Sequence, residues 1–460
     1  MNHAPGATAT KLTWRFPATF WYANVAELFE RAAFYGMFIA LSLYLTNRVG
    51  FSDVQAGIVG AFFSGGLYLL PIFMGTLADK IGFRPSLILA FFLLMIGYAL
   101  LGAFQLKWTA LAALVLIMAG GAIVKPVILG TAAKVSDAAH RARAFSIFYF
   151  MVNIGAFLGK TAAAPLRERL GLEYINYYSS SMALCALVLV AVAYQSPDTR
   201  GTGRRFSDVL ADFLHVLGNL RFMCLILIVA GFWLIQGQLY ASMPKYILRL
   251  VGEGAKPEWL ANINPFVVVL CVVPITHLVR HMKPERSIAL ALMIIPMSAL
   301  ATALSPLLQK SYGDSIHVLG MLSLHPVTVM VILGIALQGF AECFLSPKFM
   351  EYASRQAPLG QEGMYMGFQN LPTSISWFIG FFVSGFLLDA YCPDPAKLAT
   401  TDPAQHALWQ AAIAGHGPMP AAYAQAHYIW YVFAAIGVTA FVALLIFNTV
   451  TTRMDRARAN

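Results

Sequence analysis

Five charged side chains interrupt long apolar stretches of this sequence. They are Glu27, Glu30 and Arg31 in "ELFERAAFYG", Lys125 in "GGAIVKPVILG" and Glu342 in "QGFAECFLSP". A charged side chain at the centre of a membrane helix costs about 2.5 to 3.5 kcal/mol on insertion scales, so each such residue marks a functional site and needs a partner. The chemistry that acids and bases perform in such a setting is proton exchange and the binding of ions.

The spacing of these charges predicts how they pair. Glu27 and Arg31 stand one helical turn apart and can form an ion pair on one helix face, which leaves Glu30 without a local base. Lys125 lies about ten residues from the nearest end of its apolar run, too deep to reach the membrane surface. We therefore expect Glu30 to pair with Lys125, so that protonation of the acid releases the lysine to a substrate anion. A static structural ion pair is the alternative.

The composition places these charges inside a membrane. Of 460 residues, 59% are hydrophobic and 11% are charged, whereas soluble domains carry about 25% charged residues. Apolar runs of about 20 residues, enough to cross a bilayer as a helix, recur along the chain. The predicted spans are 19–47, 54–78, 85–105, 109–133, 143–164, 175–195, 222–248, 259–279, 286–308, 326–347, 363–389 and 428–449. The first has acidic residues and no cleavage site, so we expect it to be retained.

Basic residues predict the orientation of the chain. Lys and Arg gather in alternate loops and in both tails, which places both termini in the cytoplasm by the positive-inside rule. We expect a plasma membrane, the inner membrane of a bacterium. The net charge of +10 then reflects topology, and no nucleic-acid partner is expected because no soluble basic face is found.

A polar stretch divides the spans into two sets of six. The expected domains are an N-terminal six-helix bundle at 1–195, a cytoplasmic linker with a short amphipathic helix at 196–221, and a C-terminal six-helix bundle at 222–460. The linker helix lies either at the membrane interface or in solvent. An external loop at 390–427 contains a helix that Asp402 can cap, and it is either a lid or an ornament.

The loop "GTLADKIGFR" after the second span resembles the signature loop of the major facilitator superfamily. Its matching residues are Gly75, Asp79, Lys80, Gly82 and Arg84. The glycine would allow close helix approach, and the charges would form ion pairs that open and close with a cytoplasmic gate. A tight positive-inside loop is the alternative. The resemblance implies an all-α polytopic membrane protein with twelve transmembrane helices in two bundles and a substrate site between them.

Further motifs resemble the proton-coupled oligopeptide transporters along nearly the whole chain. The first span carries Glu27, Glu30, Arg31, Phe34, Tyr35 and Gly36, and later spans carry Lys125–Pro126, Asn153–Ile154–Gly155, Asn264–Pro265, Glu342 with Ser346–Pro347, and "MYMGFQN". This resemblance implies proton-driven uptake in which Glu27, Glu30, Arg31 and Lys125 couple the proton. It also implies that Glu342, Asn153 and Asn264 hold the amino group of the substrate.

The sequence departs from that family at positions that concern the substrate. Ala32 and Phe34 replace aromatic and tyrosine positions, and Phe38 stands where the family has an arginine that receives the peptide carboxylate. Gly237 stands where the seventh span often has an acid. Because both the arginine of the first span and the acid of the seventh span are absent, neither is left in the membrane as an ion without a partner. Lys348 is an added cation that either pairs with an acid, receives an anionic substrate or extends to the surface.

These observations predict a proton-coupled symporter for a short peptide or a peptide-like zwitterion, acting by alternating access. The alternative is an exporter or antiporter of a non-peptide metabolite or drug. An enzyme is not expected, since no nucleophile, metal cluster or phosphate loop accompanies the charges. We expect a monomer in a lipid bilayer, with protons as coupling ion and no other cofactor. The predicted substrate residues are Tyr35, Lys125, Asn153, Asn264, Glu342, Gln238 and Trp377.

Overall fold

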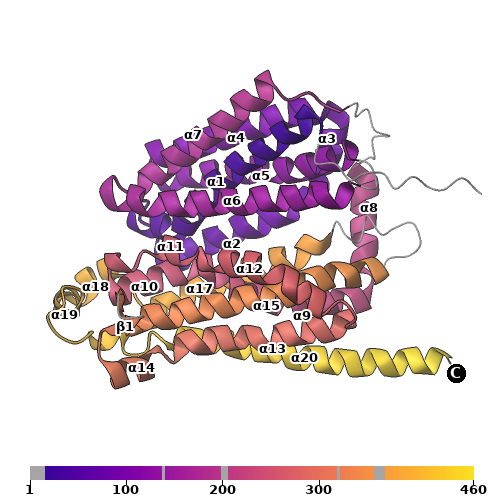
Figure 1. Cartoon of the computed structure of the whole chain (residues 1–460). Helices are drawn as coiled ribbons and strands as arrows, with labels where there is room; N and C mark the ends of the chain where they lie inside the picture. The colour runs from indigo at the N-terminus through magenta and orange to yellow at the C-terminus, as the bar shows by residue number, and fades with distance from the viewer. Residues whose placement is uncertain (1–15, 137–139, 198–205, 319–321, 357–367, 460) are drawn as a thin grey trace, which may run out of the picture.

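The computed structural model describes residues 16–136, 140–197, 206–318, 322–356 and 368–459. Two helical bundles pack side by side, the N-terminal one above and the C-terminal one below in Figure 1. Within the described residues, 11 helices are long and apolar enough to cross a membrane, and a bent pair of helices supplies the twelfth span. The prediction of an all-α polytopic membrane protein with twelve spans is confirmed.

The N-terminal bundle contains seven helices. They are α1 (Ala18–Asn47), α2 (Asp53–Leu69), α3 (Pro71–Ile81), α4 (Phe83–Ala103), α5 (Lys107–Lys134), α6 (Arg141–Arg169) and α7 (Leu172–Val192). The second predicted span is broken, because α2 and α3 meet at an angle of 48°. Pro71 opens α3 at this bend, where its ring removes a backbone donor and disfavours a continuous helix.

The C-terminal bundle has shorter elements between its spans. Its elements are α9 (Leu220–Ala241), α10 (Met243–Val251), η1 (Glu253–Ala255), α11 (Pro257–Leu260), α12 (Ile263–Leu278), α13 (Pro284–Ala303), α14 (Ser305–Tyr312), β1 (Ile316–Val318), β2 (Leu322–Leu324), α15 (Pro326–Gln356), η2 (Phe368–Asn370), α17 (Leu371–Tyr391), α18 (Pro395–Thr401), α19 (Pro403–Ile413), η3 (Ala421–Tyr423) and α20 (Tyr428–Ala459). The antiparallel pair β1 and β2 was not predicted; three-residue strands in a polar loop give too short a pattern to read.

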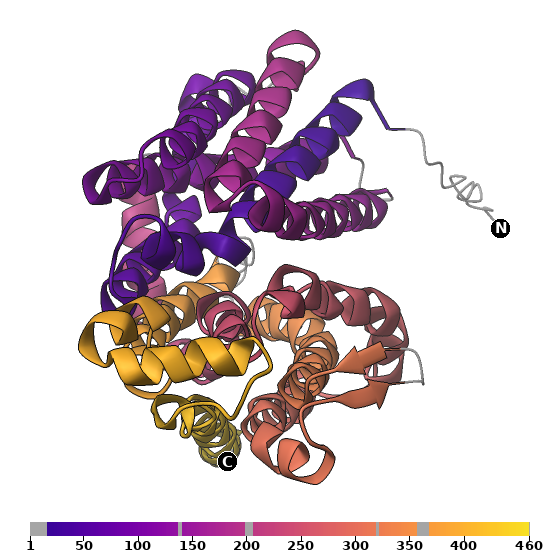
Figure 2. The same cartoon turned by 90° about the vertical axis from the view of Figure 1, so that its left-hand side faces the viewer.

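The two ends of the bundles differ. One end, here called the α19 side, carries α10, α11, α18 and α19, and the opposite end, here called the linker side, carries α8 (Phe206–Leu217). Figure 2 views the molecule from the α19 side.

The linker helix α8 contacts both bundles through aromatic rings. Phe213 packs against Phe73 of α3 at 5.5 Å and against Phe368 of η2 at 5.6 Å between ring centroids. Leu210 and Leu214 remain exposed on the same helix. Exposed leucines beside a packed aromatic face suit a helix at a membrane interface. The preceding linker residues 198–205 lie outside the described part of the chain.

The 390–427 loop folds into a helical hairpin that docks on α10. Asp402 caps α19 as predicted, its side chain accepting from the backbone N–H of Gln405 at 3.1 Å. Trp409 donates its indole N–H to the backbone oxygen of Arg249 at 2.9 Å. The hairpin is therefore a packed part of the C-terminal bundle.

Helices α2 and α17 join the two bundles through glycines. A Cβ added at Gly57 would lie 2.7 Å from the backbone oxygen of Phe381 and 2.8 Å from the Cα of Gly385. Because both neighbours are backbone atoms, neither can move without moving its helix. The contact between the bundles thus depends on the missing side chain at Gly57.

We predict that Gly57→Ala lowers the thermal stability of the protein in detergent, because overpacking in a tight contact costs about 1 to 3 kcal/mol. Gly75→Ala is the matched control, since no atom lies within 4 Å of a Cβ added there. Intrinsic fluorescence during heating measures both variants. Equal unfolding temperatures for Gly57→Ala and Gly75→Ala would contradict the role of this contact.

Candidate substrate and proton site

Arg31 holds both acids of the first span. Its Nε lies 3.1 Å from Glu27 Oε1 and also pairs with Glu30. Both carboxylates are 1% exposed. The expectation that Glu30 is left without a local base is wrong, because a guanidinium reaches the residue before it as well as the residue one turn away.

Lys125 faces this group from α5 without contacting it. No described residue forms a hydrogen bond with Lys125, or an ion pair with it within 4.0 Å. Its charge nevertheless acts on Glu27 and Glu30, and Arg31 opposes it. The direct Glu30–Lys125 pair is absent from this conformation of the described chain, and the coupling role of Lys125 stays a prediction.

Glu342 forms the second charged group. Asn264 donates to Glu342 Oε2 at 3.5 Å, so the structure brings these two predicted residues together. Asn153 instead donates to the backbone oxygen of Tyr149 on its own helix at 2.8 Å. The role of Asn153 in holding an amino group stays a prediction, since its amide hydrogen bond is to its own helix.

Tyr35 follows the first charged group on α1, one helical turn after Arg31. The Tyr35 ring is 6.1 Å from that of Tyr240 on α9. It therefore connects the proton-coupling residues to the C-terminal bundle.

Aromatic rings from both bundles meet next to Tyr35. Phe38 stacks on Trp377 at 5.3 Å with an interplanar angle of 10°, and lies 4.9 Å from Tyr240. Tyr68 approaches Trp377 edge-on at 4.8 Å. We call Tyr35, Phe38, Tyr68, Tyr240 and Trp377 the aromatic cluster.

Trp377 contacts both positions, 38 and 237, at which the sequence departs from the peptide-transporter pattern. Phe38 stacks on its ring, and a Cβ added at Gly237 would lie 3.0 Å from its indole nitrogen. A larger side chain at position 237 would therefore displace the tryptophan. The buried Trp377 Nε1 has no hydrogen-bond partner among the described residues. It is a free donor between the bundles.

Gln238 is held by its own bundle. Its amide nitrogen donates to the backbone oxygens of Leu234 and Gly380 at 3.0 and 3.4 Å, and its side-chain oxygen accepts from Ser242 at 2.7 Å. These contacts join α9 to α17. A role for Gln238 in substrate binding stays a prediction, since these bonds already engage the amide.

Sequence reasoning missed Lys160, a buried cation on α6. It is 2% exposed, and its ammonium lies 5.3 Å from the Tyr35 ring and 5.7 Å from the Tyr240 ring. The signal was available, because Lys160 falls within the predicted span 143–164. Lys160 stands near the end of that span, where a lysine side chain can often extend to the membrane surface.

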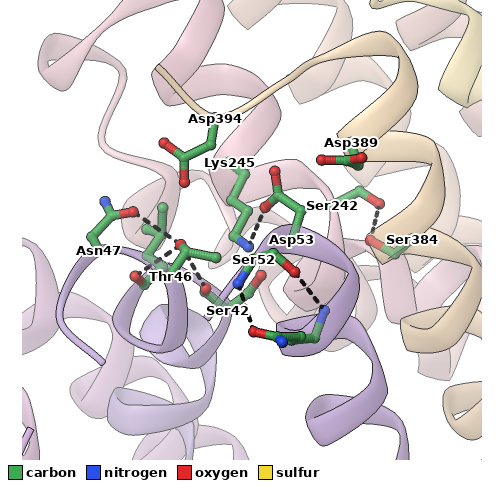
Figure 3. Close-up of polar contacts among 12 residues, drawn as sticks. Ser42, Thr46, Asn47, Ser52, Asp53, Ser242, Lys245, Ser384, Asp389 and Asp394 are labelled. Carbon is green, nitrogen blue, oxygen red and sulfur yellow. Dashed lines mark hydrogen bonds and ion pairs between the residues drawn. The ribbon is translucent and has the colours of Figure 1, made fainter. Parts of the chain in front are cut away.

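An ion network that the sequence did not predict joins the bundles on the α19 side (Figure 3). Asp53, at the start of α2, accepts from Lys245 at 2.7 Å and from Arg249 at 2.9 and 3.0 Å, and these side chains are at most 6% exposed. Nearby, Arg167 binds Glu258 at 2.5 Å and also pairs with Glu253. The α19 side is closed by these cross-bundle pairs.

The predicted gating loop lies on the linker side, but it is not a loop: residues 75–81 belong to α3 and Arg84 to α4, so that Gly82 alone separates the two helices. Gly75 has no neighbour within 4 Å of an added Cβ, so the close helix approach expected there is not present in this conformation. Lys80 is exposed. Arg84 donates to the backbone oxygen of Ala191 at 2.5 Å. The side chain of Asp79 lies outside the described part of the chain.

Lys348, the added cation of the tenth span, pairs locally. Its ammonium donates to Glu351 at 2.8 Å and to the backbone oxygen of Met282 at 3.0 Å. Among the open alternatives, the structure shows pairing with an acid.

Comparison with known proteins identifies the family. The model of the Major Facilitator Superfamily matches residues 24–316, more than half of the chain. The chain belongs to the Major Facilitator Superfamily. Members of this superfamily are membrane transporters, and the segment 75–84 falls within the match.

A curated relative and several solved structures are similar to this chain over most of its length. The multidrug resistance protein MdtH of Escherichia coli O1:K1 is 22% identical over 360 residues, 77% of this chain and 83% of MdtH. A bacterial homologue of the human drug peptide transporters PepT1 and PepT2 superposes with a TM-score of 0.69 at 19% identity, covering 96% of this chain and 99% of the homologue. A POT family transporter in complex with 5-aminolevulinic acid gives 0.69 at 17% identity, covering 95% and 96%. At these identities the structures show a shared fold.

We predict that Asp53→Asn destabilises the protein strongly, because it leaves two buried cations facing a neutral partner, and breaking a buried ion pair costs about 3 to 5 kcal/mol. The matched control is Asp389→Asn on the same side. Its partner Lys397 is 2.7 Å away with both side chains exposed by at least 31%, and an exposed pair contributes about 0 to 1 kcal/mol. Thermal unfolding in detergent checks both, and equal losses would refute the special role of Asp53.

Proposed function

We propose that this transporter imports short peptides or peptide-like zwitterions together with protons across the plasma membrane. The observation that carries the proposal is the presence of a buried charged group on each bundle, Arg31 with its two acids on α1 and Glu342 with Asn264 on the other bundle. Bases on the N-terminal bundle and the acid Glu342 on the C-terminal bundle, beside one aromatic cluster, suit a ligand that carries both a carboxylate and an amino group. The likeness to solved peptide transporters supports this class of substrate.

The proton-coupling part of the proposal rests on the first span. Arg31 holds Glu27 and Glu30 in a buried group, and the charge of Lys125 acts on both acids. Protonation of an acid removes one of the charges that Arg31 and Lys125 face. Each base then becomes available to another anion, so that proton and substrate bind in a linked way.

Alternating access follows from the closed α19 side. We propose that the linker side is cytoplasmic, as the positive charges of the loops indicate, and that the Asp53 network is an external gate. Outward opening then requires separation of Asp53 from Lys245 and Arg249. We treat one chain as the transport unit because both bundles of the site belong to it.

A second candidate function is export of an aromatic or amphipathic compound. The observation in its favour is the aromatic cluster, in which Phe38 and Trp377 stack where a peptide site would place charge. The name of the relative MdtH agrees with this class. Exchange of the proton for such a compound would use the same first-span acids.

The decisive test is uptake by purified protein in liposomes. We predict that an inward proton gradient drives accumulation of labelled di- and tripeptides, because proton entry neutralises Glu27 or Glu30. Absence of both uptake and competition for every peptide in a mixed library would reject the importer. Proton release from the liposomes on addition of a drug-like amine would favour the exporter.

Coupling has its own test. We predict that Lys125→Ala and Glu30→Gln retain counterflow exchange of peptide but lose gradient-driven accumulation, because the linked protonation is removed. Lys107→Ala is the matched control on the same helix, since Lys107 is exposed. Unchanged accumulation in both Lys125→Ala and Glu30→Gln would refute their coupling role.

A further inference from the structure

Lys160 is a buried cation at the junction of the two bundles. Its ammonium donates to the backbone oxygen of Ala261, in the C-terminal bundle, at 3.2 Å. The rings of Tyr35 and Tyr240 flank it, one from each bundle. It is therefore placed at the aromatic cluster and not at the lipid surface.

The charge of Lys160 is not matched by an adjacent carboxylate. No described acid lies within 4.0 Å of its nitrogen, and Glu342 is the acid whose charge acts on it. Two other buried lysines of the chain differ, because Lys245 has Asp53 at 2.7 Å and Lys348 has Glu351 at 2.8 Å. A carbonyl and two ring faces compensate a buried ammonium poorly compared with an anion.

The hydrogen bonds of Lys160 also leave room for an anionic ligand. An ammonium has three donors, and a single protein acceptor, the Ala261 oxygen, bonds to it within the described chain. The Trp377 indole N–H, in the same aromatic cluster, also lacks a partner there. Lys160 and Trp377, two side chains with unsatisfied N–H donors beside one cluster, suit a ligand with acceptor oxygens.

We propose that Lys160 binds the carboxylate of the transported zwitterion while Glu342 binds its amino group. This assignment rests on the proposed function and names the anion subsite of the same site. The two side chains belong to different bundles, α6 and α15, and they contact neighbouring residues of one segment: Lys160 donates to the backbone oxygen of Ala261, and Glu342 accepts from Asn264. A zwitterion between them would form an ion pair with each side chain.

Substrate binding would also change the contact between the bundles. A carboxylate is a stronger acceptor for an ammonium than a neutral backbone oxygen. A bound substrate therefore competes with the Ala261 oxygen for Lys160. The anion subsite and one of the contacts between α6 and the C-terminal bundle thus share one side chain.

The test compares a dipeptide with its amide in the full-length protein in liposomes. Ala-Ala and Ala-Ala amide differ only in the carboxylate and compete against uptake of a labelled dipeptide. We expect the wild type to prefer the acid by roughly ten- to a hundredfold, the range for a hydrogen bond to a charged group. Equal competition by the two compounds in the wild type overturns the proposal without any variant.

Two neutral variants assign the preference to Lys160. Lys160→Met and Lys160→Gln should bind both compounds equally well, and Gln still has a donor for the Ala261 oxygen, so its result separates charge from that contact. Lys348→Met is the matched control, because it removes a buried lysine that has its own acid, and it should keep the preference.

The outcomes separate the two proposals. If either folded Lys160 variant still prefers the acid, the anion subsite is overturned while the proposed function stands. If Lys348→Met loses the preference as well, the effect belongs to buried charge in general, and the anion subsite is again overturned. No uptake of any peptide by the wild type refutes the proposed function, and the anion subsite falls with it. Thermal unfolding shows which variants are folded.

Discussion

The cost of burying a charge governs this structure. Inside the bundles a carboxylate or an ammonium is tolerated when an opposite charge or several hydrogen bonds lie within reach. Arg31 meets this requirement for two acids within one helix, and Asp53 meets it for two bases across the two bundles. The first arrangement is local and survives any movement of the bundles, whereas the second exists only while the α19 side is closed. The same physical requirement thus produces a permanent group and a conditional one.

The helices and the local part of the site could be predicted from the sequence, and the long-range part could not. Apolar runs locate the spans because length and hydropathy are properties of each segment alone. The cross-bundle pairs were missed because their partners lie far apart in the chain, as with Asp53 and Arg249, 196 residues apart. Glu30 was misassigned for the opposite reason, since rules for helix spacing do not count the reach of a guanidinium to its neighbour. Pairing between buried charges therefore needs the three-dimensional arrangement.

Trp377 shows why substitutions in such a site have to be considered together. Its ring fills the space between Phe38 on α1 and Gly237 on α9, so a change at either position affects the other through the tryptophan. The sequence alone indicated that a base and an acid were absent. The structure adds what replaced them, a flat apolar surface with one unsatisfied indole N–H. Charge recognition in this region then depends on residues beyond the first and seventh spans.

The α18–α19 hairpin has a mechanical consequence. Trp409 donates a hydrogen bond to the backbone oxygen of Arg249. The guanidinium of Arg249 in turn donates to the backbone oxygen of Cys392, at the start of the hairpin, and pairs with Asp53 in the opposite bundle. The hairpin is thereby linked to the C-terminal bundle at the closed side and projects beyond it. A binding protein that contacts the hairpin alone would move together with the C-terminal bundle. A binding protein that contacts both the hairpin and the start of α2 would hold the two bundles together on the α19 side.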